Sequence, residues 1–553
     1  MNLTYDYKMF QETFESEFTW LNGFMRNVRR FGYKPAVISP VEKKQWTYEE
    51  LNVDCNQLAN AMKKDDVGKA DIVMFQLFNC PQFLFSYIAA QKIGAIANPV
   101  NFNLSAGETA EIMNHNRAKV YVYDCEVMET AVKALELSEH KPSVILAVNC
   151  SNKEITLPNG HQFFDDYVKN AEPTDPPIDF APHIYDEVVR LQTSGTTGTP
   201  KGVPLNNVNE VLSAHDVIMH FPLAPTDITM NMTPWFHRGG LHSGGPTPTL
   251  YVGGALVIMR TFNPKVTLEY IERFGISFIT GVPSVLTLLA SRQEKHPKDI
   301  SSLKGIVTMG SPLEKEACIR FQKVLTPNIF NGYGTTESFW NTFLRPFDLP
   351  EMSGTAGRSC TDDEVRIVKV YDDKKAEPED MVPMDSIAEG EVIIKCPAKS
   401  TYCYANNPQA TAEKFYKGWL YTGDIATWDK RQYITIAGRK DDMIISKGEN
   451  IYPARIEEVL NCHPKVSDCI VTGVPDSTRG ESVAAYVIAE DDSLTVAELM
   501  DYCAASPNIS KYQAPRYYRF VNDLPRTATG KKQHFVIKKQ AKEDLANGLL
   551  LKK

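Results

Sequence analysis

Residues 193–202, which read TSGTTGTPKG, restrict the fold of this chain more than any other segment. Their three glycines let the backbone approach an anion closely, the hydroxyl side chains offer hydrogen-bond donors, and Lys201 adds a positive charge. The apolar residues 188–191 come just before this loop and predict a buried strand. We therefore expect a phosphate-binding loop at the carboxyl end of a strand, the edge where open parallel sheets bind ligands.

A flexible surface linker and a phosphate loop of the NTPase type are the alternatives to this interpretation. A solvated linker would not need Pro200 to stiffen it directly before a lysine. The NTPase loop requires GxxxxGK followed by Ser or Thr, whereas Pro200 stands five residues after Gly195 and Gly202 follows Lys201. The expected ligand is therefore a nucleotide, and the expected chemistry is not simple hydrolysis.

Strand-like and helix-like segments alternate over the first part of the chain, which is typical of a mainly parallel sheet covered on both faces. Capping boxes that begin at Thr47 and Ser105 each predict the start of a helix. The other expected helices are residues 264–274, 284–291 and 313–325. The expected strands are residues 72–78, 119–123, 143–148, 255–259, 276–280, 305–309 and 328–331.

After residue 354 the pattern changes to strand-like runs without long helices between them, at residues 364–371, 391–396 and 432–436. A compact unit follows, with expected strands at residues 442–445, 468–472 and 483–488 and expected helices at residues 453–462 and 496–503. We therefore predict an α/β fold whose large N-terminal domain, residues 1–439, has parallel and mixed sheets flanked by helices plus a smaller β layer. Residues 440–553 are expected to form a small, mobile α+β C-terminal domain.

Composition narrows the classes of function. The formal net charge of −9 disfavours nucleic acid as the main partner. Eleven cysteines, an odd number without a C-x-x-C pair, are expected to be reduced thiols rather than a disulfide framework or a zinc site. The sequence has no run of about eighteen apolar residues and no evident signal peptide, so we expect no membrane span and a cytoplasmic protein. Residues 526–553 carry eight Lys or Arg, and the simplest interpretation of them is a solvated basic tail.

A second candidate segment, residues 331–337, reads NGYGTTE. A carboxylate directly after a glycine-rich turn and a threonine suits a hydrated magnesium ion, while hydroxyl and backbone groups contact phosphate. Glu337 alone is equally typical of an acid at a helix N-terminus. Its expected position at the same sheet edge as residues 193–202 favours the metal.

Three further candidates are weak when taken singly. Asp424 follows a tight turn and suits the two hydroxyls of a ribose, and Arg439 can bind ribose or phosphate bidentately. Lys531 stands on a constrained turn near the end of the chain, where its charge would suit a carboxylate approaching a phosphate. Proteins commonly contain Gly-Asp turns, surface Arg-Lys pairs and solvated lysines. The evidence for a site is therefore that all three candidates occur together, in this order along the chain.

Taken in order, these segments resemble the motifs of the adenylate-forming superfamily, which includes acyl-CoA synthetases, firefly-type luciferases and the adenylation domains of peptide synthetases. The resemblance extends over nearly the whole chain. Its segments are residues 193–202, 234–237, 333–337, 422–424, 438–442, 446–451 and Lys531. The resemblance implies a two-step reaction with ATP, Mg²⁺ and coenzyme A, in which a small C-terminal domain rotates about Asp441.

The resemblance also implies a role for each matching residue. Lys531, His237, Thr336 and Glu337 would be catalytic, and Glu337 would bind the metal. The nucleotide would be bound by Thr193, Ser194, Gly195, Thr196, Thr197, Lys201, Gly310, Ser311, Pro312, Asn331, Gly332, Tyr333, Gly334, Thr335, Asp424 and Arg439. Lys447, Gly448 and Glu449 would line the CoA tunnel. The acyl pocket would include Trp235, His237, Arg238, Val282 and Phe339.

The expected function is therefore an AMP-forming ligase that joins a small carboxylic acid to CoA. Aromatic, alicyclic and medium-chain acids all stay open, and so does a homodimer. The rival functions are loading of an acyl carrier protein, a luciferase-like oxygenation and nucleotide binding without catalysis. Arg238 stands where many relatives carry an apolar residue. It is interpreted as structural, as a contact to a CoA phosphate, or as a reader of a second polar or anionic group on the acid.

Overall fold

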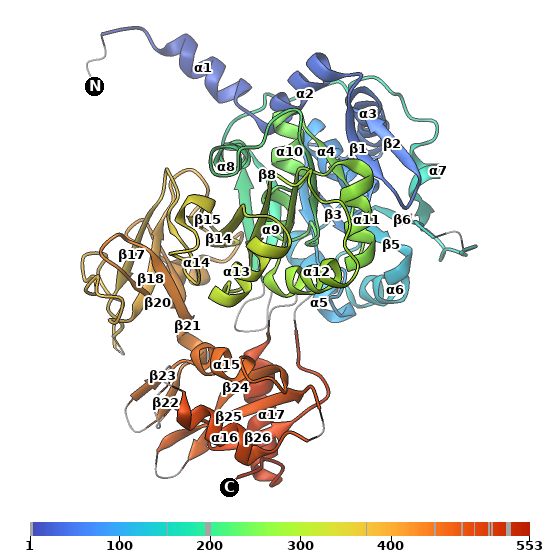
Figure 1. Ribbon diagram of the computed structural model, residues 1–553. Coiled ribbons are helices and arrows are strands. Elements are labelled where there is room, and N and C mark those ends of the chain that lie inside the picture. Colours follow the sequence, from blue (N-terminus) through green and yellow to red (C-terminus); the bar gives the residue numbers. More distant parts are fainter. Residues whose placement is uncertain are drawn as a thin grey trace.

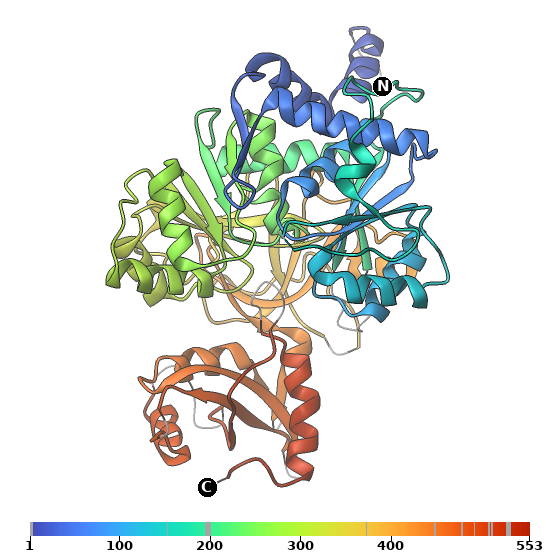
Figure 2. The same ribbon diagram turned by 90° about the vertical axis from the view of Figure 1, so that its right-hand side faces the viewer.

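The computed structural model describes residues 4–151, 153–193, 201–371, 373–446, 449–476, 479–491, 493–506, 509, 513–526 and 532–552. Four β-sheets organise these residues. Two large sheets with their helices form the main body of the molecule, a third lies beside them, and the fourth belongs to the small unit at the bottom of Figure 1. Figure 2 shows the same division from the side.

The seven-stranded sheet is parallel except for its last pair. In spatial order its strands are β7 (Gln162–Phe163), β6 (Val144–Val148), β5 (Val120–Asp124), β3 (Ile72–Gln76), β4 (Ile96–Pro99), β8 (Glu187–Thr193) and β9 (Lys201–Asn206). The helices of this part are α3 (Tyr48–Lys64), α4 (Pro81–Lys92), α5 (Ala106–Asn116), α6 (Met128–Leu137) and α7 (Phe164–Val168), with a short 3-10 helix η1 (Cys125–Val127).

The nine-stranded sheet has a parallel centre and antiparallel edges. Its order is β16 (Arg358–Ser359), β15 (Phe339–Leu344), β14 (Ile329–Thr335), β13 (Gly305–Met309), β12 (Phe278–Gly281), β10 (Ile228–Asn231), β11 (Ala255–Val257), β1 (Pro35–Ser39) and β2 (Lys44–Thr47). Around it lie α8 (Asn207–His220), α9 (Arg238–His242), α10 (Pro246–Val252), α11 (Pro264–Phe274), α12 (Pro283–Lys295), α13 (Lys315–Val324) and η2 (Pro346–Asp348). The N-terminal helices are α1 (Lys8–Glu17) and α2 (Trp20–Phe31).

Two smaller sheets complete the fold. The antiparallel third sheet contains β17 (Glu364–Val368), β18 (Gly390–Lys395), β20 (Trp419–Trp428), β19 (Phe415–Tyr416) and β21 (Ile434–Arg439), with helix α14 (Pro408–Lys414) before β19. After η3 (Lys440–Asp442), the fourth sheet contains β23 (Glu449–Ile451), β22 (Ile444–Ser446), β25 (Gly480–Ala489), β24 (Val466–Asp476) and β26 (Tyr517–Phe520). Its helices are α15 (Pro453–Asn461), α16 (Val496–Ala505) and α17 (His534–Ala546).

This architecture confirms the predicted α/β fold with large mixed sheets and a small C-terminal unit. Both predicted capping boxes form, because the side chains of Thr47 and Ser105 accept hydrogen bonds from the backbone N–H groups of Glu50 and Glu108 at 3.2 and 3.3 Å. All eleven cysteines lie in the described part of the chain, and each is unpaired. No helix among the described residues is long and apolar enough to span a lipid bilayer.

The prediction of a solvated basic tail over residues 526–553 is wrong. Residues 534–546 form α17, whose Ile537 and Ala541 are buried in a hydrophobic cluster with β24. These two residues lie four positions apart and therefore share one face of the helix. Lys532 also bonds to Glu457 at 3.1 Å. The many charges conceal this short apolar stripe in the sequence.

Three local predictions also need correction. Residues 422–424, expected as a tight turn before the acid of Asp424, lie within strand β20. The glycine-bearing turn expected at residues 332–334 does not form: β14 continues through Thr335 and pairs with β15, and the turn follows it. The strand expected over residues 442–445 begins later, because Asp442 belongs to η3 and β22 starts at Ile444. At residues 332–334, pairing within the β14–β15 hairpin outweighs the local preference of glycine for turns.

Candidate active site

The two ends of the proposed phosphate loop lie opposite each other. Thr193 is the last residue of β8, Lys201 is the first of β9, and the two are paired in the sheet. The loop therefore leaves β8 at its carboxyl end, as expected. Residues 194–200, which include the predicted phosphate ligands Ser194, Gly195, Thr196 and Thr197, lie outside the described residues.

Glu337 lies in the turn between β14 and β15 and is 7% exposed. Its Oε1 accepts a hydrogen bond from the hydroxyl of Tyr404 at 2.5 Å. The ammonium group of Lys201 lies 5.5 Å from the centre of the Tyr404 ring. Within the described part of the chain, the other carboxylate oxygen has no hydrogen-bond partner, so an oxygen ligand of the kind that Mg²⁺ prefers is available at Glu337.

Three predicted nucleotide residues meet across the third sheet. Asp424 of β20 and Arg439 of β21 are direct neighbours in the sheet, and Arg439 Nη1 donates to Asp424 Oδ1 at 2.6 Å. The hydroxyl of Tyr333 donates to Asp424 Oδ2 at 2.7 Å. Burial and the charge of Asp424 raise the pKa of Tyr333 well above its ordinary value, so this phenol stays protonated and keeps donating.

The glycines of the predicted nucleotide site allow close backbone approaches. A Cβ on Gly334 would lie 1.5 Å from the carbonyl oxygen of Phe339, and Gly310 has a φ of +83°. Gly310 begins the 310–312 turn directly after β13, and Asn331 and Gly332 lie on the neighbouring strand β14. Turn and strand end therefore lie at the carboxyl edge of the parallel strands.

The residues predicted for the acyl pocket divide into two groups. His237, Arg238, Val282 and Phe339 lie next to the segments just described, whereas Trp235 is 1% exposed and packs in the core against Phe83 with ring centres 5.5 Å apart. Among the described residues, His237 Nε2 is buried without a hydrogen-bond partner. Burial lowers the pKa of His237 to about 4, so its imidazole is neutral at physiological pH.

Arg238 is 3% exposed and uses its guanidinium inside the protein. Its Nη1 donates to the carbonyl of Thr336 and its Nη2 to the carbonyl of Lys399, both at 2.7 Å. The guanidinium carbon lies 5.6 Å from the centre of the Phe339 ring. Burial lowers the pKa of Arg238 to about 10, against the opposing charge of Glu210. These contacts favour the structural interpretation of Arg238, since both Nη atoms are already engaged.

The C-terminal predictions are described only in part. Asp441 lies in η3, and its carbonyl accepts a hydrogen bond from Lys538 of α17 at 3.4 Å. Glu449 begins β23. Lys447, Gly448 and Lys531, together with the side chain of Glu449, lie outside the described residues. The catalytic lysine, the hinge and the CoA tunnel therefore stay predictions.

Sequence reasoning missed Tyr404 and Lys414. Tyr404 holds Glu337, and Lys414 Nζ donates to the carbonyl of Thr422 at 2.7 Å, beside the ribose candidate Asp424. Neither stands in a glycine-rich or charged motif, and each contact joins residues that the third sheet brings together. A signal for them was absent from the local sequence.

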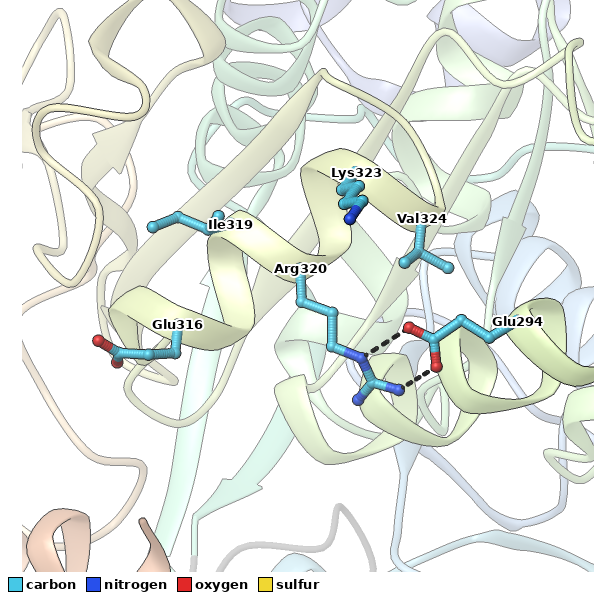
Figure 3. A pocket seen from close by; sticks show the side chains of 6 residues that line it. All are labelled: Glu294, Glu316, Ile319, Arg320, Lys323 and Val324. Atoms are coloured by element: carbon cyan, nitrogen blue, oxygen red, sulfur yellow. Dashed lines mark hydrogen bonds and ion pairs between the residues drawn. The ribbon is translucent and has the colours of Figure 1, made fainter.

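A surface hollow of about 540 Å³ lies elsewhere, on the outer helices α12 and α13. Figure 3 shows its lining and the ion pair between Arg320 and Glu294, whose closest atoms are 2.6 Å apart. Its residues are Glu294, Glu316, Ile319, Arg320, Lys323 and Val324. Because this hollow is open and lies on a helix surface, we expect the active site at the carboxyl edge of the strands instead.

Comparison with known families identifies the family of this chain. Residues 24–401 match the model of the AMP-binding enzyme family, and residues 455–531 match that of the AMP-binding enzyme C-terminal domain. The chain belongs to the AMP-binding enzyme family. It is an acid–thiol ligase of the AMP-forming kind, related to acyl- and aryl-CoA ligases.

Individual relatives are similar over most of their length. An indoleacetate–CoA ligase of Aromatoleum aromaticum is 30% identical over 509 residues, covering 90% of this chain and 93% of the relative. The putative acyl-CoA synthetase YngI of Bacillus subtilis is 29% identical, covering 92% and 94% of the two chains. A feruloyl-CoA synthase of an Amycolatopsis species is 29% identical, covering 88% and 92%.

Solved structures agree in fold. The anthranilate CoA ligase AuaEII in complex with anthranoyl-AMP superposes with a TM-score of 0.85 at 25% identity, covering 97% of this chain and 99% of that one. The o-succinylbenzoate CoA synthetase MenE of Bacillus subtilis, in complex with ATP and a magnesium ion, has a TM-score of 0.78 at 25% identity, covering 92% and 98%. Relatives of this chain therefore bind ATP, magnesium and an acyl-adenylate.

Proposed function

We propose that this protein is an ATP-dependent carboxylic acid:CoA ligase that forms an acyl-adenylate and then transfers the acyl group to CoA. The observation that carries the proposal is a pair of carboxylate centres beside β14: Tyr333 of β14 bonds to Asp424, and Glu337 lies in the turn that follows β14. Asp424 is held by Tyr333 and Arg439, and Glu337 is held by Tyr404. The first centre suits ribose hydroxyls, and the second suits a metal bound to phosphates.

The first step brings two anions together, the acid carboxylate and the α-phosphate of ATP. Positioning and charge neutralisation therefore dominate this step. Mg²⁺ bound at Glu337 would offset part of the phosphate charge. Lys201, at the end of the phosphate loop, and Lys531, by the family resemblance, would supply the protein's positive charges. The neutral imidazole of His237 lies on the acyl side, where it adds no charge that would compete with them.

The second step needs a different arrangement, because the thiol of CoA displaces AMP and Lys531 has to leave. One surface cannot present both arrangements at once, so a rotation of the C-terminal unit about Asp441 would exchange them. Lys447, Gly448 and Glu449 would then line the CoA tunnel.

For the acid, we propose an aromatic, alicyclic or medium-chain substrate. The support is the set of names of the relatives, which include indoleacetate–CoA ligase and feruloyl-CoA synthase. Phe339, which is 3% exposed beside Arg238, adds an aromatic surface to this region. Pyrophosphate release from ATP and Mg²⁺ should be measured with a panel of indoleacetate, ferulate, benzoate, cyclohexanecarboxylate and octanoate.

The test of the whole proposal separates the two steps. Purified protein, ATP, Mg²⁺ and the best acid should release pyrophosphate, and thioester should form only when CoA is added. Loading of an acyl carrier protein is the alternative, and it predicts thioester on a carrier protein and none with free CoA. Absence of pyrophosphate release with every acid would refute both.

A further inference from the structure

Lys414 is the last residue of α14 and lies between the two carboxylate centres of the site. Its Nζ donates to the carbonyl of Thr422 at 2.7 Å, two residues before Asp424. An ammonium group has three N–H donors, and among the described residues this is the one hydrogen-bond acceptor that Lys414 has. Two donors are therefore left for a ligand.

The surroundings of Lys414 are electrostatically unusual. Burial lowers the pKa of Lys414 and is the largest influence. The negative charge of Glu337 raises this pKa, and the positive charge of Arg439 lowers it. A Cβ on Gly423 would lie 3.8 Å from Lys414 Nζ and 3.6 Å from Arg439 Nη2, so the two cations lie next to the same residue of β20. Arg439 is already paired with Asp424 at 2.6 Å, whereas Lys414 has no carboxylate within ion-pair distance among the described residues.

Helix α14 fixes this position. The side chain of Thr411 in α14 accepts a hydrogen bond from the backbone N–H of Tyr404 at 2.9 Å, and Tyr404 holds Glu337. The same short helix thus supports Glu337, the candidate metal ligand, through Tyr404. Through Lys414 it reaches Thr422, which is close to the ribose candidate Asp424. A nucleotide with its ribose at Asp424 and its phosphates near Glu337 has to pass between these two points.

We propose that Lys414 binds the α-phosphate of the nucleotide and is a further substrate-binding residue of this enzyme. This inference rests on the proposed function, which places the ribose at Asp424 and the phosphates at Glu337. The ammonium group keeps its bond to Thr422 and donates its remaining N–H groups to phosphate oxygens. It would stay in place in both steps of the reaction, unlike Lys531, because α14 leads directly into β19 of the third sheet.

The test compares AMP with adenosine, which lacks the phosphate, by isothermal titration calorimetry on the full chain. Lys414→Met should weaken AMP binding about 10- to 100-fold, as expected for loss of a charge-assisted hydrogen bond, and should change adenosine binding by less than about threefold. Lys414→Gln keeps a donor for the Thr422 carbonyl but has no charge, and it should lose AMP affinity like Lys414→Met. Lys414→Arg should retain most of it.

A matched control is available in the same hairpin. Lys417 is exposed and pairs with Glu377 at 2.7 Å, so Lys417→Met should bind AMP as the unchanged protein does. The inference is overturned if the Lys414 variants weaken the binding of AMP and of adenosine equally, because Lys414 would then only support the backbone at Thr422. It is also overturned if they weaken the binding of neither ligand. The unchanged protein tests the proposed function separately: should it bind no AMP, that function fails and this inference with it.

Discussion

Replacing Lys399 by methionine should destabilise the protein in a way that depends on pH. Lys399 is 1% exposed, and its ammonium group lies 2.9 Å from Asp216 and 2.7 Å from Asp363. It also donates to the carbonyl of Trp340 at 2.5 Å. The ammonium group of Lys399 is thus a buried cation between two carboxylates. Because the site is closed to solvent, water would not compensate these carboxylates if the lysine were removed.

The expected size follows from these contacts. Removing one partner of a buried ionic cluster leaves uncompensated charge and costs about 3–5 kcal/mol. For a unit of several hundred residues, about 1 kcal/mol corresponds to roughly 1 °C in melting temperature, so Lys399→Met should lower Tm by roughly 3–5 °C at pH 8. Lys395→Met changes an exposed lysine at the end of β18, four residues before Lys399. It is the control and should shift Tm by less than about 1 °C.

The loss should shrink in acid. Burial raises the pKa of Asp363 to about 6 even beside Lys399, so this carboxyl binds a proton more readily in the folded chain than in the unfolded one. Its contribution to stability is therefore greatest at low pH and is lost as pH rises through about 6. Without Lys399 the pKa of Asp363 rises further. At pH 5.5 Asp363 is therefore protonated, and the variant contains one buried charge fewer than at pH 8.

Differential scanning calorimetry at the two pH values measures this difference. The double variant Lys399→Met, Asp363→Asn should recover part of the lost Tm at pH 8, because Asp216 keeps its contact with His220 at 3.2 Å. An equal loss of Tm at both pH values, or a double variant no more stable than Lys399→Met, would refute the reasoning.

Four further predictions concern activity. Lys531→Ala should slow adenylate formation about 100-fold or more yet spare thioester formation from supplied acyl-adenylate, and an equal loss in both half-reactions would contradict its role. Asp441→Pro fixes φ and should spare ATP–pyrophosphate exchange while slowing thioester release at least about tenfold in stopped-flow assays. Tyr404→Phe removes the hydroxyl that holds Glu337 and should lower kcat/KM about 10- to 100-fold, most strongly at limiting Mg²⁺. Arg439→Lys should raise KM for ATP roughly tenfold, since lysine lacks the planar fork that reaches Asp424, whereas an unchanged KM would exclude ribose binding there.

Residues in motifs with a local physical signature could be predicted from the sequence. The glycines and hydroxyls of residues 193–202 indicated a loop after β8, and the pair of Asp424 and Arg439 came from two short turn motifs that the third sheet joins. The capping box at Thr47 is equally local. The atoms of the capping box lie within a few residues of one another, whereas Asp424 and Arg439 are 15 positions apart and are brought together by the pairing of β20 with β21.

Contacts between distant segments could not be predicted in this way. Tyr404 and Glu337 are 67 positions apart, and their hydrogen bond exists because the third sheet packs beside the β14–β15 turn. Lys414 stands in a sequence of ordinary helical composition and gains its role from β20. The error at residues 332–334 has a different cause, because these residues pair with the next strand, β15, in a hairpin that their glycine-rich composition did not indicate.

Arg238 connects the β14–β15 turn to the segment that follows β18 of the third sheet, and it limits which parts of the protein can move. One guanidinium donates to the carbonyl of Thr336 in the β14–β15 turn and to the carbonyl of Lys399, and Lys399 is itself held by two buried carboxylates. Breaking these contacts would leave a buried charge without partners, so the turn and the third sheet should move as one body. We infer that the rotation proposed for the second step takes place beyond β21, and η3 with Asp441 is the first segment after that strand.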